Sequence, residues 1–196
     1  NQLTKKKIIY NFRKNDILNG GQGAPLTPIF HQMISSERKI DLPICFLNIG
    51  GISNVTIIKD KIGSDEVFSK DIGPGNCLID LWIRKNTDHK FDKDGNFAAR
   101  GNKNEIVLET GNELYKNRQE KDKLSFDTND FDVSFCRGLS IEDGAATITN
   151  FTAGIISDSV SSLLSKNKSI KKILVCGGGR RNKVLLNEIK KRLPTE

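Results

Sequence analysis

The feature that most constrains this chain is a glycine pair between two apolar runs. Residues 44–49 form the first run, Gly50 and Gly51 follow, and Ser53 and Asn54 open the second run. This pattern predicts a β-hairpin with a tight turn, because glycine has no Cβ atom to obstruct the backbone. Converging backbone N–H groups in such a turn bind anions. We therefore expect Gly50, Gly51, Ser53 and Asn54 to contact a phosphate, although most isolated Gly-Gly hairpins bind nothing.

Three further glycine-rich turns accompany the hairpin. Residues 20–26 precede it with Gly-Gly-Gln-Gly-Ala-Pro-Leu, and residues 71–76 follow it with Asp-Ile-Gly-Pro-Gly-Asn. Residues 177–179 are three consecutive glycines near the C-terminus. Each turn joins an apolar run to a predicted helix or second strand, and turns at strand ends assemble ligand sites in α/β proteins. The four turns therefore favour one composite site.

The hydrophobic pattern predicts alternating strands and helices, with residues 13–23 as a loop. Strands are expected at 8–12, at 172–176 and, as a β-meander, at 44–49, 54–59 and 66–71. Helices are expected at 25–35, 76–85, 103–116, 140–164 and 182–193. Ser140 is the predicted N-cap of the longest helix. This order is typical of an α/β domain with the actin-like ATPase (ribonuclease H-like) fold, in which a mixed sheet carries flanking helices.

Composition argues against several classes of function. The net charge is +7, but the lysines are scattered, and one Trp and two Tyr are few for stacking on bases, which disfavours a nucleic-acid module. Four cysteines without a C-x-x-C pair and two histidines disfavour a disulfide framework or a zinc site. No apolar stretch approaches the roughly 20 residues of a membrane span, and no signal-peptide pattern opens the sequence. We expect reduced thiols and a cytoplasmic protein.

Three carboxylates stand beside glycine turns. Phosphoryl transfer needs a magnesium ion and a carboxylate that activates the nucleophile, and Asp16, Asp71 and Asp80 are the candidates. Each of them can instead be a helix cap or a turn former. In an actin-like domain the hairpin turn faces the phosphates. Residues 177–179 then pack against adenosine, because only glycine lets the backbone lie flat on a purine or ribose.

The motifs, taken together and in order, resemble the 1,6-anhydro-N-acetylmuramic acid kinase family. The matching segments cover nearly the whole chain, which makes them far more specific than one glycine loop. They are residues 20–26 with Pro28 and His31, 48–54, 71–76 with Asp80, 91–95, 142–147 with 151–153, and 175–179 with Asn182.

This resemblance implies a cytoplasmic bacterial enzyme of peptidoglycan recycling, usually a homodimer, that acts on a small amino sugar and on neither nucleic acid nor membranes. Such enzymes use ATP and Mg²⁺ to phosphorylate O6 while water opens the 1,6-anhydro ring, giving N-acetylmuramic acid 6-phosphate. By its position six residues before Gln22, Asp16 is the implied base. Magnesium is expected to bind through ATP, near Asp71, without direct protein ligands. The implied substrate residues are Gln22 and Gly23, and the implied nucleotide residues are Gly50, Gly51, Ser53, Asn54, Asp71, Gly73, Gly75, Asn76, Gly177, Gly178, Gly179 and Asn182.

The chain also departs from the family pattern. It matches the C-terminal portion of the family truncated at both ends, so residues 1–40 are expected to end a first lobe. Residues 41–196 are expected to form a second, nucleotide-binding lobe with a polar insertion near 86–138. Asn11-Phe12-Arg13 replaces an Asp-Phe-Arg sequence, and residues 125–129 replace a basic segment.

Because half of a bilobal cleft is missing, the isolated chain is expected to bind adenine nucleotide weakly without turnover. Two other functions stay open, namely another actin-like sugar or acid kinase and a nucleotide-binding scaffold without catalysis. A nucleic-acid module is a distant third.

Overall fold

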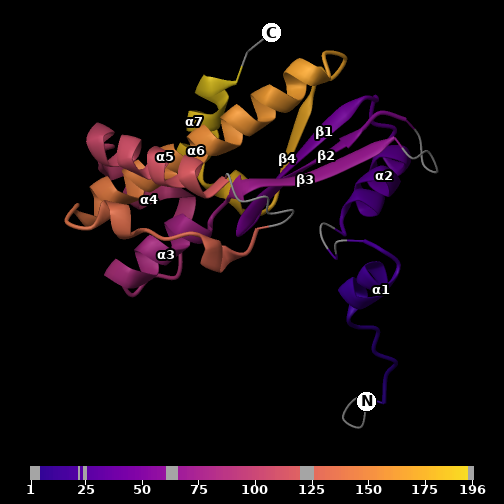
Figure 1. The fold of residues 1–196 in the computed structure, drawn as a ribbon, viewed down its shortest axis with the longest axis horizontal. Helices are drawn as coiled ribbons and strands as arrows, with labels where there is room; N and C mark the ends of the chain where they lie inside the picture. Colours follow the sequence, from indigo (N-terminus) through magenta and orange to yellow (C-terminus); the bar gives the residue numbers. More distant parts are fainter. Residues whose placement is uncertain (1–4, 22, 24–25, 61–65, 120–125, 194–196) are drawn as a thin grey trace.

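The structure is a computed structural model that describes residues 5–21, 23, 26–60, 66–119 and 126–193, with side chains at 117–119 left aside. The chain forms a four-stranded sheet. The strands are β1 (Ile44–Ile49), β2 (Ile52–Ile58), β3 (Val67–Pro74) and β4 (Ile173–Cys176). The longer helices are α1 (Phe12–Leu18), α2 (Pro28–Glu37), α3 (Cys77–Asn86), α4 (Asn96–Arg100), α5 (Glu105–Gln119), α6 (Ile141–Lys166) and α7 (Lys183–Arg192). Short 3-10 helices are η1 (Lys93–Gly95), η2 (Thr128–Asp130), η3 (Ser134–Cys136) and η4 (Gly178–Arg181). Figure 1 shows α2 on one side of the sheet and α6 on the other.

The sheet is mixed, with the strand order β3-β2-β1-β4. The first three strands are antiparallel neighbours, and β4 pairs parallel to β1 after the α6 crossover. Both the α/β class and the β-meander are thus confirmed. Because side chains alternate along a strand, the register places Leu174, Phe46, Thr56 and Ser69 side by side on one face of the sheet. We call this face the outer face and the opposite one the inner face.

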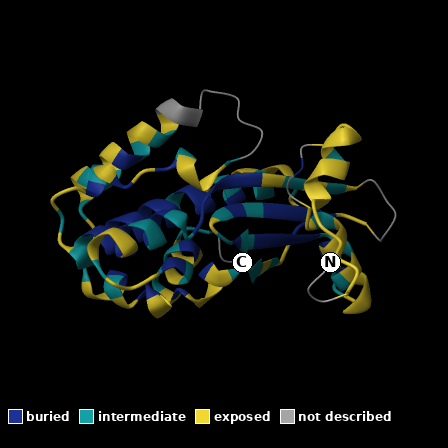
Figure 2. Cartoon of the chain, turned by 90° about the horizontal axis from the view of Figure 1, so that it is seen from below, coloured by how far each residue is buried: buried dark blue, intermediate teal, exposed yellow. Residues whose placement is uncertain are grey.

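The main core lies on the inner face, against α6. Leu47 and Val55 of the sheet and Ile148 and Ile156 of α6 are fully buried, and Figure 2 shows this dark blue centre. α3 and α7 also pack on α6, and the Trp82 Nε1–H donates to the Ile141 carbonyl over 2.9 Å. The predicted N-cap is confirmed, because the Ser140 hydroxyl accepts from the Asp143 N–H at 3.1 Å. These contacts hold the ends of β1 and β4 in fixed positions.

The outer face carries a smaller cluster under α2. Ile44, Phe46 and Ile58 are buried there, with Ile34, Ile40 and Leu42 packed against them. His31 and Ser35 are the buried residues of α2. The predicted division into lobes near residue 40 remains a prediction, but α2 packs on the sheet.

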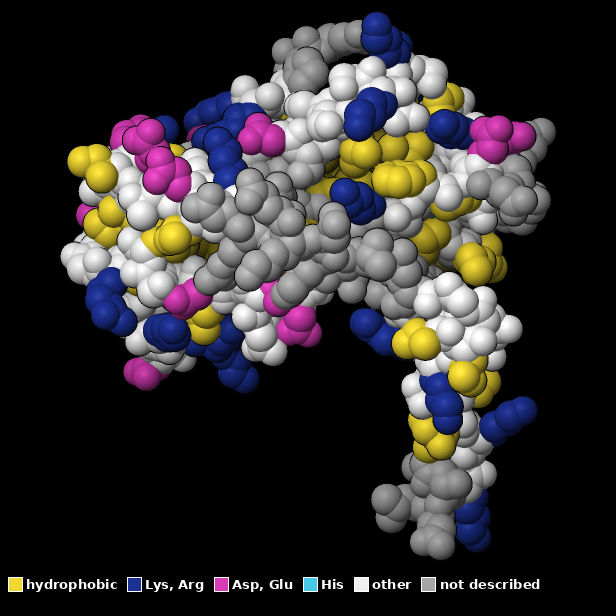
Figure 3. All heavy atoms as spheres, viewed as in Figure 1, with side chains coloured by type: hydrophobic (Ala, Val, Ile, Leu, Met, Phe, Trp, Pro, Cys, Tyr) yellow, Lys and Arg dark blue, Asp and Glu magenta, His cyan; other side chains and the backbone are white. Residues whose placement is uncertain are grey.

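The N-terminal prediction was partly wrong. Residues 5–11 form no strand, and the predicted loop contains the helix α1. A strand needs a neighbour for its backbone hydrogen bonds, and here Ile9 and Tyr10 are 70% and 78% exposed. Figures 1 and 3 show this segment extending from the body, with apolar and basic side chains on its surface. The other predicted strands and helices are present, with ends shifted by up to three residues: α2 begins at Pro28, and β3 continues to Pro74.

The described part of the chain holds no helix with both the length and the apolar character that crossing a membrane requires.

Candidate functional site

Three of the predicted glycine turns meet at the carboxyl ends of β1 and β4. The Gly75 N–H donates to the Gly51 carbonyl at 2.8 Å, and the Asn76 N–H donates to the Gly50 carbonyl at 2.7 Å. The Asn76 amide adds a bond of 3.0 Å to the Gly50 carbonyl. The hairpin turn thus uses its carbonyls to fix the start of α3, while the Gly50 N–H closes the hairpin on the Ile52 carbonyl at 3.2 Å.

The glycines are needed because backbones approach closely here. A Cβ atom on Gly75 would collide with the Gly50 carbonyl oxygen, and one on Gly179 would collide with Ile49. Gly177 has φ +84°, and a Cβ atom there would lie 2.5 Å from the Ile49 carbonyl oxygen. Glycine is the residue that tolerates both conditions. We call this set of contacts, formed by Gly50, Gly51, Gly75, Asn76 and Gly177–Gly179, the glycine junction.

A cavity of about 350 Å³ opens beside the glycine junction. Such a volume lies within the usual range of small-molecule sites, roughly 300–1,000 Å³. Its wall carries charges of both signs, because Lys93 and Arg181 line it together with three carboxylates. Its lining comes from α3, the segment around η1, η4 and the start of α7: Asn76, Ile79, Asp80, Phe91, Asp92, Lys93, Asp94, Gly178, Arg181 and Asn182.

Two of the polar lining residues hold the wall in place. The Asp92 carboxylate accepts from the N–H groups of Phe97 and Ala98, at 2.8 and 3.1 Å. The Asn182 Oδ1 accepts from the Leu185 N–H at 3.0 Å and thereby caps α7. Gly95, with φ +80°, lets this wall pass directly beside Asn182. The residues at 91–94 were quoted in the family motif but were not predicted as site residues; a glycine shortly after an Asp-rich turn was the available signal.

A second, more open cavity of about 540 Å³ lies on the other side of α3. Gly51 and Cys77 line it on one side, and Thr128 and Asp132 line it on the other. Asp80 lines both cavities. Burial raises the pKa of Asp80 to about 6, an effect that nearby Arg84 opposes and Asp92 strengthens.

We expect Asp80 to make stability depend on pH. Its pKa is about 6 in the fold and roughly 3.9 in an unfolded chain, so the fold retains a proton that the unfolded chain releases. The stabilisation by protonated Asp80 is present at low pH and is lost as the pH rises through these two values. Asp80→Asn removes this loss. In urea unfolding, the free energy of unfolding of the variant should therefore increase relative to that of the wild type as the pH rises from about 4 to about 6.

The exposed Asp88 provides the matched control, since Asp88→Asn should track the wild type across the series. A difference between Asp80→Asn and wild type that stays constant from acid to neutral pH would contradict the assignment.

A row of mostly polar side chains crosses the outer face of the sheet. It lies next to the row that contains Phe46 and Thr56, on the side of the glycine junction. The register aligns Cys176, Asn48, Asn54 and Asp71. The Cys176 thiol donates to the Asn48 Oδ1 at 3.8 Å, and the Phe126 N–H donates to Asp71 at 3.2 Å. Burial raises the pKa of Asp71, while the Phe126 N–H and the charge of Arg13 act in the opposite direction. Asn54 keeps a buried Oδ1 with no partner in the described part of the structure.

Two predicted phosphate contacts have other surroundings. Ser53 is fully buried on the inner face, and its hydroxyl lies without a partner among the described residues. Gly73, with φ +141°, packs against Ile155 and the Tyr115 hydroxyl. Neither residue lines the two cavities described above.

Asp16 lies on α1, and its carboxylate is held by the turn that follows the helix. The Gly23 N–H donates to the Asp16 Oδ2 at 2.7 Å, and Gly21 leaves room for the carboxylate because it has no Cβ atom. The structure does not join Asp16 to the glycine junction, because α1 stands away from α3, α6 and α7 (Figure 1). Arg13 is the α1 residue whose charge reaches Asp71. Gln22, a predicted substrate residue, lies outside the described residues.

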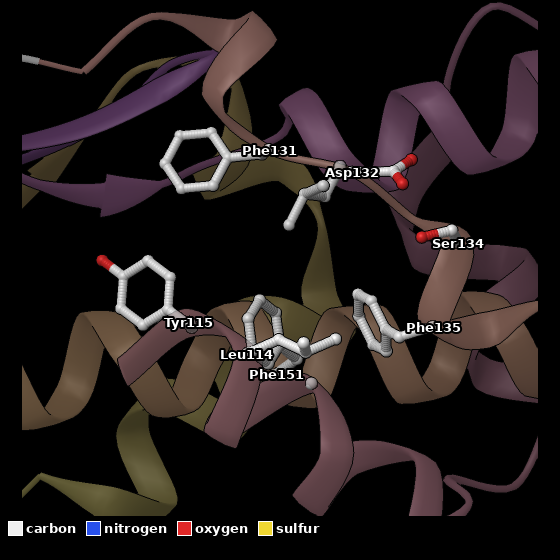
Figure 4. A pocket seen from close by; sticks show the side chains of 9 residues that line it. Leu114, Tyr115, Phe131, Asp132, Ser134, Phe135 and Phe151 are labelled. Carbon is white, nitrogen blue, oxygen red and sulfur yellow. The ribbon is translucent and has the colours of Figure 1, made fainter. Parts of the chain in front are cut away.

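An aromatic cluster packs between α5, α6 and residues 131–135. Figure 4 shows the rings of Tyr115, Phe131, Phe135 and Phe151 around a void of about 40 Å³. Phe135 packs over Gly111 of α5, where a Cβ atom would lie 2.8 Å from its ring. The void is far below the volume of a ligand site, so this cluster fixes α5 and residues 131–135 on α6.

The chain is similar to known proteins along its whole length. The model of the anhydro-N-acetylmuramic acid kinase family matches residues 1–196. Similar curated proteins carry that name. The one from Pelagibacter ubique is 47% identical over 193 residues, which is 98% of this chain and 51% of that protein. Those from Zymomonas mobilis and Burkholderia thailandensis are 36% and 37% identical, over 94% and 96% of this chain and 48% and 50% of the relatives. The chain thus spans about half the length of the curated relatives it matches.

A solved structure, the activator of the 2-hydroxyisocaproyl-CoA dehydratase from Clostridium difficile with bound ADPNP, is similar at a TM-score of 0.47 and 18% identity. The match covers 80% of this chain and 53% of that one.

Proposed function

The chain belongs to the anhydro-N-acetylmuramic acid kinase family, and from this premise we propose that the complete protein phosphorylates 1,6-anhydro-N-acetylmuramic acid with ATP while water opens the anhydro ring. The product is N-acetylmuramic acid 6-phosphate, an intermediate of peptidoglycan recycling. The observation that carries the proposal is the convergence of three family motifs at the glycine junction, two of which also line the adjoining cavity. Residues 48–54, 71–76 and 175–182 are far apart in sequence, and they meet at the glycine junction.

ATP is proposed to occupy the 350 Å³ cavity and the adjoining glycine junction. The adenosine is proposed to lie against Asn182 and Gly178, which line the cavity; an added Cβ atom on Gly178 would meet only the Asn76 side chain, at 3.7 Å. Gly177 and Gly179 let the backbone beside it pack closely on Ile49. The phosphates extend toward Gly50, Gly51 and the start of α3. Asn54 and Asp71, which are aligned on the outer face of the sheet, are proposed nearer the phosphates, and the Asn54 Oδ1 has no partner among the described residues.

Magnesium fits this site as an ion held mainly by phosphates and water, the usual mode for Mg²⁺ with nucleotides. The described residues include no cluster of three or more His, Cys, Asp or Glu able to hold a metal ion. The oxygens of Asp92 already accept two N–H groups, whereas Asp80 lines both cavities. We assign Asp80 as the carboxylate nearest the water shell of the ion, and Asp71 as the more distant carboxylate. When bound, the ion would neutralise charge on the phosphates.

Asp16 is proposed as the base. Water attacks the anomeric carbon from the face opposite the bridging oxygen, and the Asp16 carboxylate takes the proton that this water loses. The bond from the anomeric carbon to O6 breaks, O6 takes the γ-phosphoryl group, and ADP leaves. The Gly23 N–H, bound to Asp16 Oδ2, keeps one carboxylate oxygen fixed and leaves the other to face the water.

A catalytically inactive nucleotide-binding scaffold is the second candidate. The position of α1 favours it, because Asp16 lies away from the glycine junction in this structure. The two candidates differ in whether Asp16 reaches the sugar when the complete protein closes over its substrates. Another sugar or acid as the phosphate acceptor is a variant of the first candidate.

The setting is proposed to be the bacterial cytoplasm, with the complete protein as a homodimer. All four cysteines, Cys45, Cys77, Cys136 and Cys176, are free thiols, which suits a reducing compartment. Neither nucleic acid nor a membrane is proposed as a partner.

The test is to incubate the complete protein with Mg²⁺, ATP and 1,6-anhydro-N-acetylmuramic acid, and to follow ADP release and product mass. We expect equal amounts of ADP and of a sugar that is heavier by one phosphoryl group (HPO3) and one water. Release of ADP without a new sugar would contradict the proposal. Nucleotide binding without ADP release would contradict it as well and would support the scaffold.

A further inference from the structure

A buried histidine connects α2 to the outer face of the sheet. His31 is 6% exposed, and its ring stacks on Phe46 at 4.5 Å between centroids with only 2° between the planes. Its Nδ1 lies 3.0 Å from the Thr56 Oγ1. The next strand continues the series, with Thr56 Oγ1 3.3 Å from Ser69 Oγ. Phe46, Thr56 and Ser69 are aligned residues on β1, β2 and β3, so one side chain of α2 engages three strands.

The donor and the acceptor of each hydrogen bond in this series follow from the number of protons available. Each hydroxyl has a single proton to donate. The Ser69 hydroxyl donates its proton to the Val55 carbonyl at 2.9 Å, because a carbonyl can only accept. Ser69 must then accept from Thr56, and Thr56, having used its proton, must accept from His31 Nδ1. The relay therefore runs from His31 to Thr56, to Ser69 and to the Val55 carbonyl.

We infer that His31 is held as the neutral Nδ1–H tautomer and acts as a positioning residue for Asp16. The inference rests on the proposed function. The sequence provides the connection: α2 begins at Pro28, five residues after Gly23, whose N–H holds the Asp16 carboxylate. The relay fixes α2 on the sheet one residue row away from Asn48, Asn54 and Asp71.

The burial of the ring agrees with this tautomer. Desolvation lowers the pKa of His31, so the ring stays neutral near physiological pH with a single N–H. The stacked Phe46 ring fixes the plane of the imidazole, and the Ser35 hydroxyl donates to the His31 carbonyl at 2.7 Å. A donor held this rigidly sets the position of α2, which begins five residues after Gly23.

Three variants separate the relay from simple packing. His31→Phe keeps an aromatic ring for stacking on Phe46 but removes the donor. His31→Asn removes the ring but places an amide N–H near the position of Nδ1. Thr56→Val removes the acceptor at nearly constant shape. We expect His31→Phe and Thr56→Val to lower kcat of the complete protein about 10- to 100-fold, the size of effect that a small misplacement of catalytic groups produces. The KM for ATP should change by less than about twofold, because the glycine junction is untouched. His31→Asn should recover much of the rate.

Imidazole ¹⁵N NMR of the complete protein measures the tautomer directly, with His31→Phe identifying the signal. The expected result is a neutral ring protonated at Nδ1, together with the loss of kcat. An Nε2–H ring overturns the relay. An Nδ1–H ring with unchanged kcat in His31→Phe and Thr56→Val overturns the positioning role. A wild-type protein without product overturns the proposed function and the positioning role with it, whereas the NMR result still decides whether the relay exists.

Discussion

Replacing Asp16 by Asn lowers the rate of sugar phosphorylation by the complete protein by about 10²- to 10⁴-fold, the usual contribution of a general base. Asn has nearly the same shape, and its amide oxygen can still accept the Gly23 N–H that holds Asp16. The amide cannot take a proton from water, so the loop is kept and the base is lost. The measurement is kcat from ADP release, with the product identified by mass.

The binding of ATP to Asp16→Asn should equal that of the wild type, because Asp16 lies away from the glycine junction. Asp88→Asn, at an exposed position, is the matched control and should leave the rate unchanged. If Asp16→Asn retains a rate within about twofold of the wild type, Asp16 is not the base, since a positioned base contributes far more.

Replacing Gly177 by Ala strongly reduces both ATP affinity and stability. The residue has φ +84°, which costs a non-glycine residue roughly 1–3 kcal/mol. The added Cβ atom would lie 2.5 Å from the Ile49 carbonyl oxygen, and overpacking of this kind costs roughly another 1–3 kcal/mol. Relief of the collision would separate β4 from β1 at the edge of the proposed adenosine site. Urea unfolding and equilibrium ATP binding measure the two effects.

Gly154→Ala provides the comparison, because an added Cβ atom on that α6 glycine would meet no atom within 4 Å. Alanine is a better helix former than glycine by roughly 1 kcal/mol, so this variant should be slightly more stable than the wild type. A Gly177→Ala protein that unfolds and binds ATP like Gly154→Ala would show that the close approach at the glycine junction has no functional consequence.

The sheet and its helices were predictable because their sequence signals are local and mutually consistent. The meander, the Ser140 cap of α6 and the junctions at residues 50–51 and 177–179 all follow from apolar period and turn chemistry. The prediction of a strand at residues 8–12 was wrong for the opposite reason. Its composition suits a strand, but strand formation depends on a partner elsewhere in the molecule, and Tyr10 is 78% exposed here.

The site was only partly predictable. Ser53 and Asn54 are neighbours in a strand, so their side chains point to opposite faces. The prediction placed both on a phosphate, but the structure buries Ser53 in the inner face and leaves Asn54 on the outer one. The cavity wall at residues 91–94 comes from a segment with no regular signal of its own. Its place beside Asn182 depends on long-range packing around Gly95.

The transfer of oxygen from water tests the account most directly. The complete protein, ATP, Mg²⁺ and 1,6-anhydro-N-acetylmuramic acid are incubated in oxygen-18 water, beside unlabelled product kept in the same water to measure exchange at the anomeric carbon. The proposed reaction gives a ring-opened 6-phosphate that acquires one heavy oxygen at the anomeric carbon faster than this control, and no such product with Asp16→Asn. A phosphorylated sugar that acquires no heavy oxygen beyond exchange, or full labelling with Asp16→Asn, would contradict it.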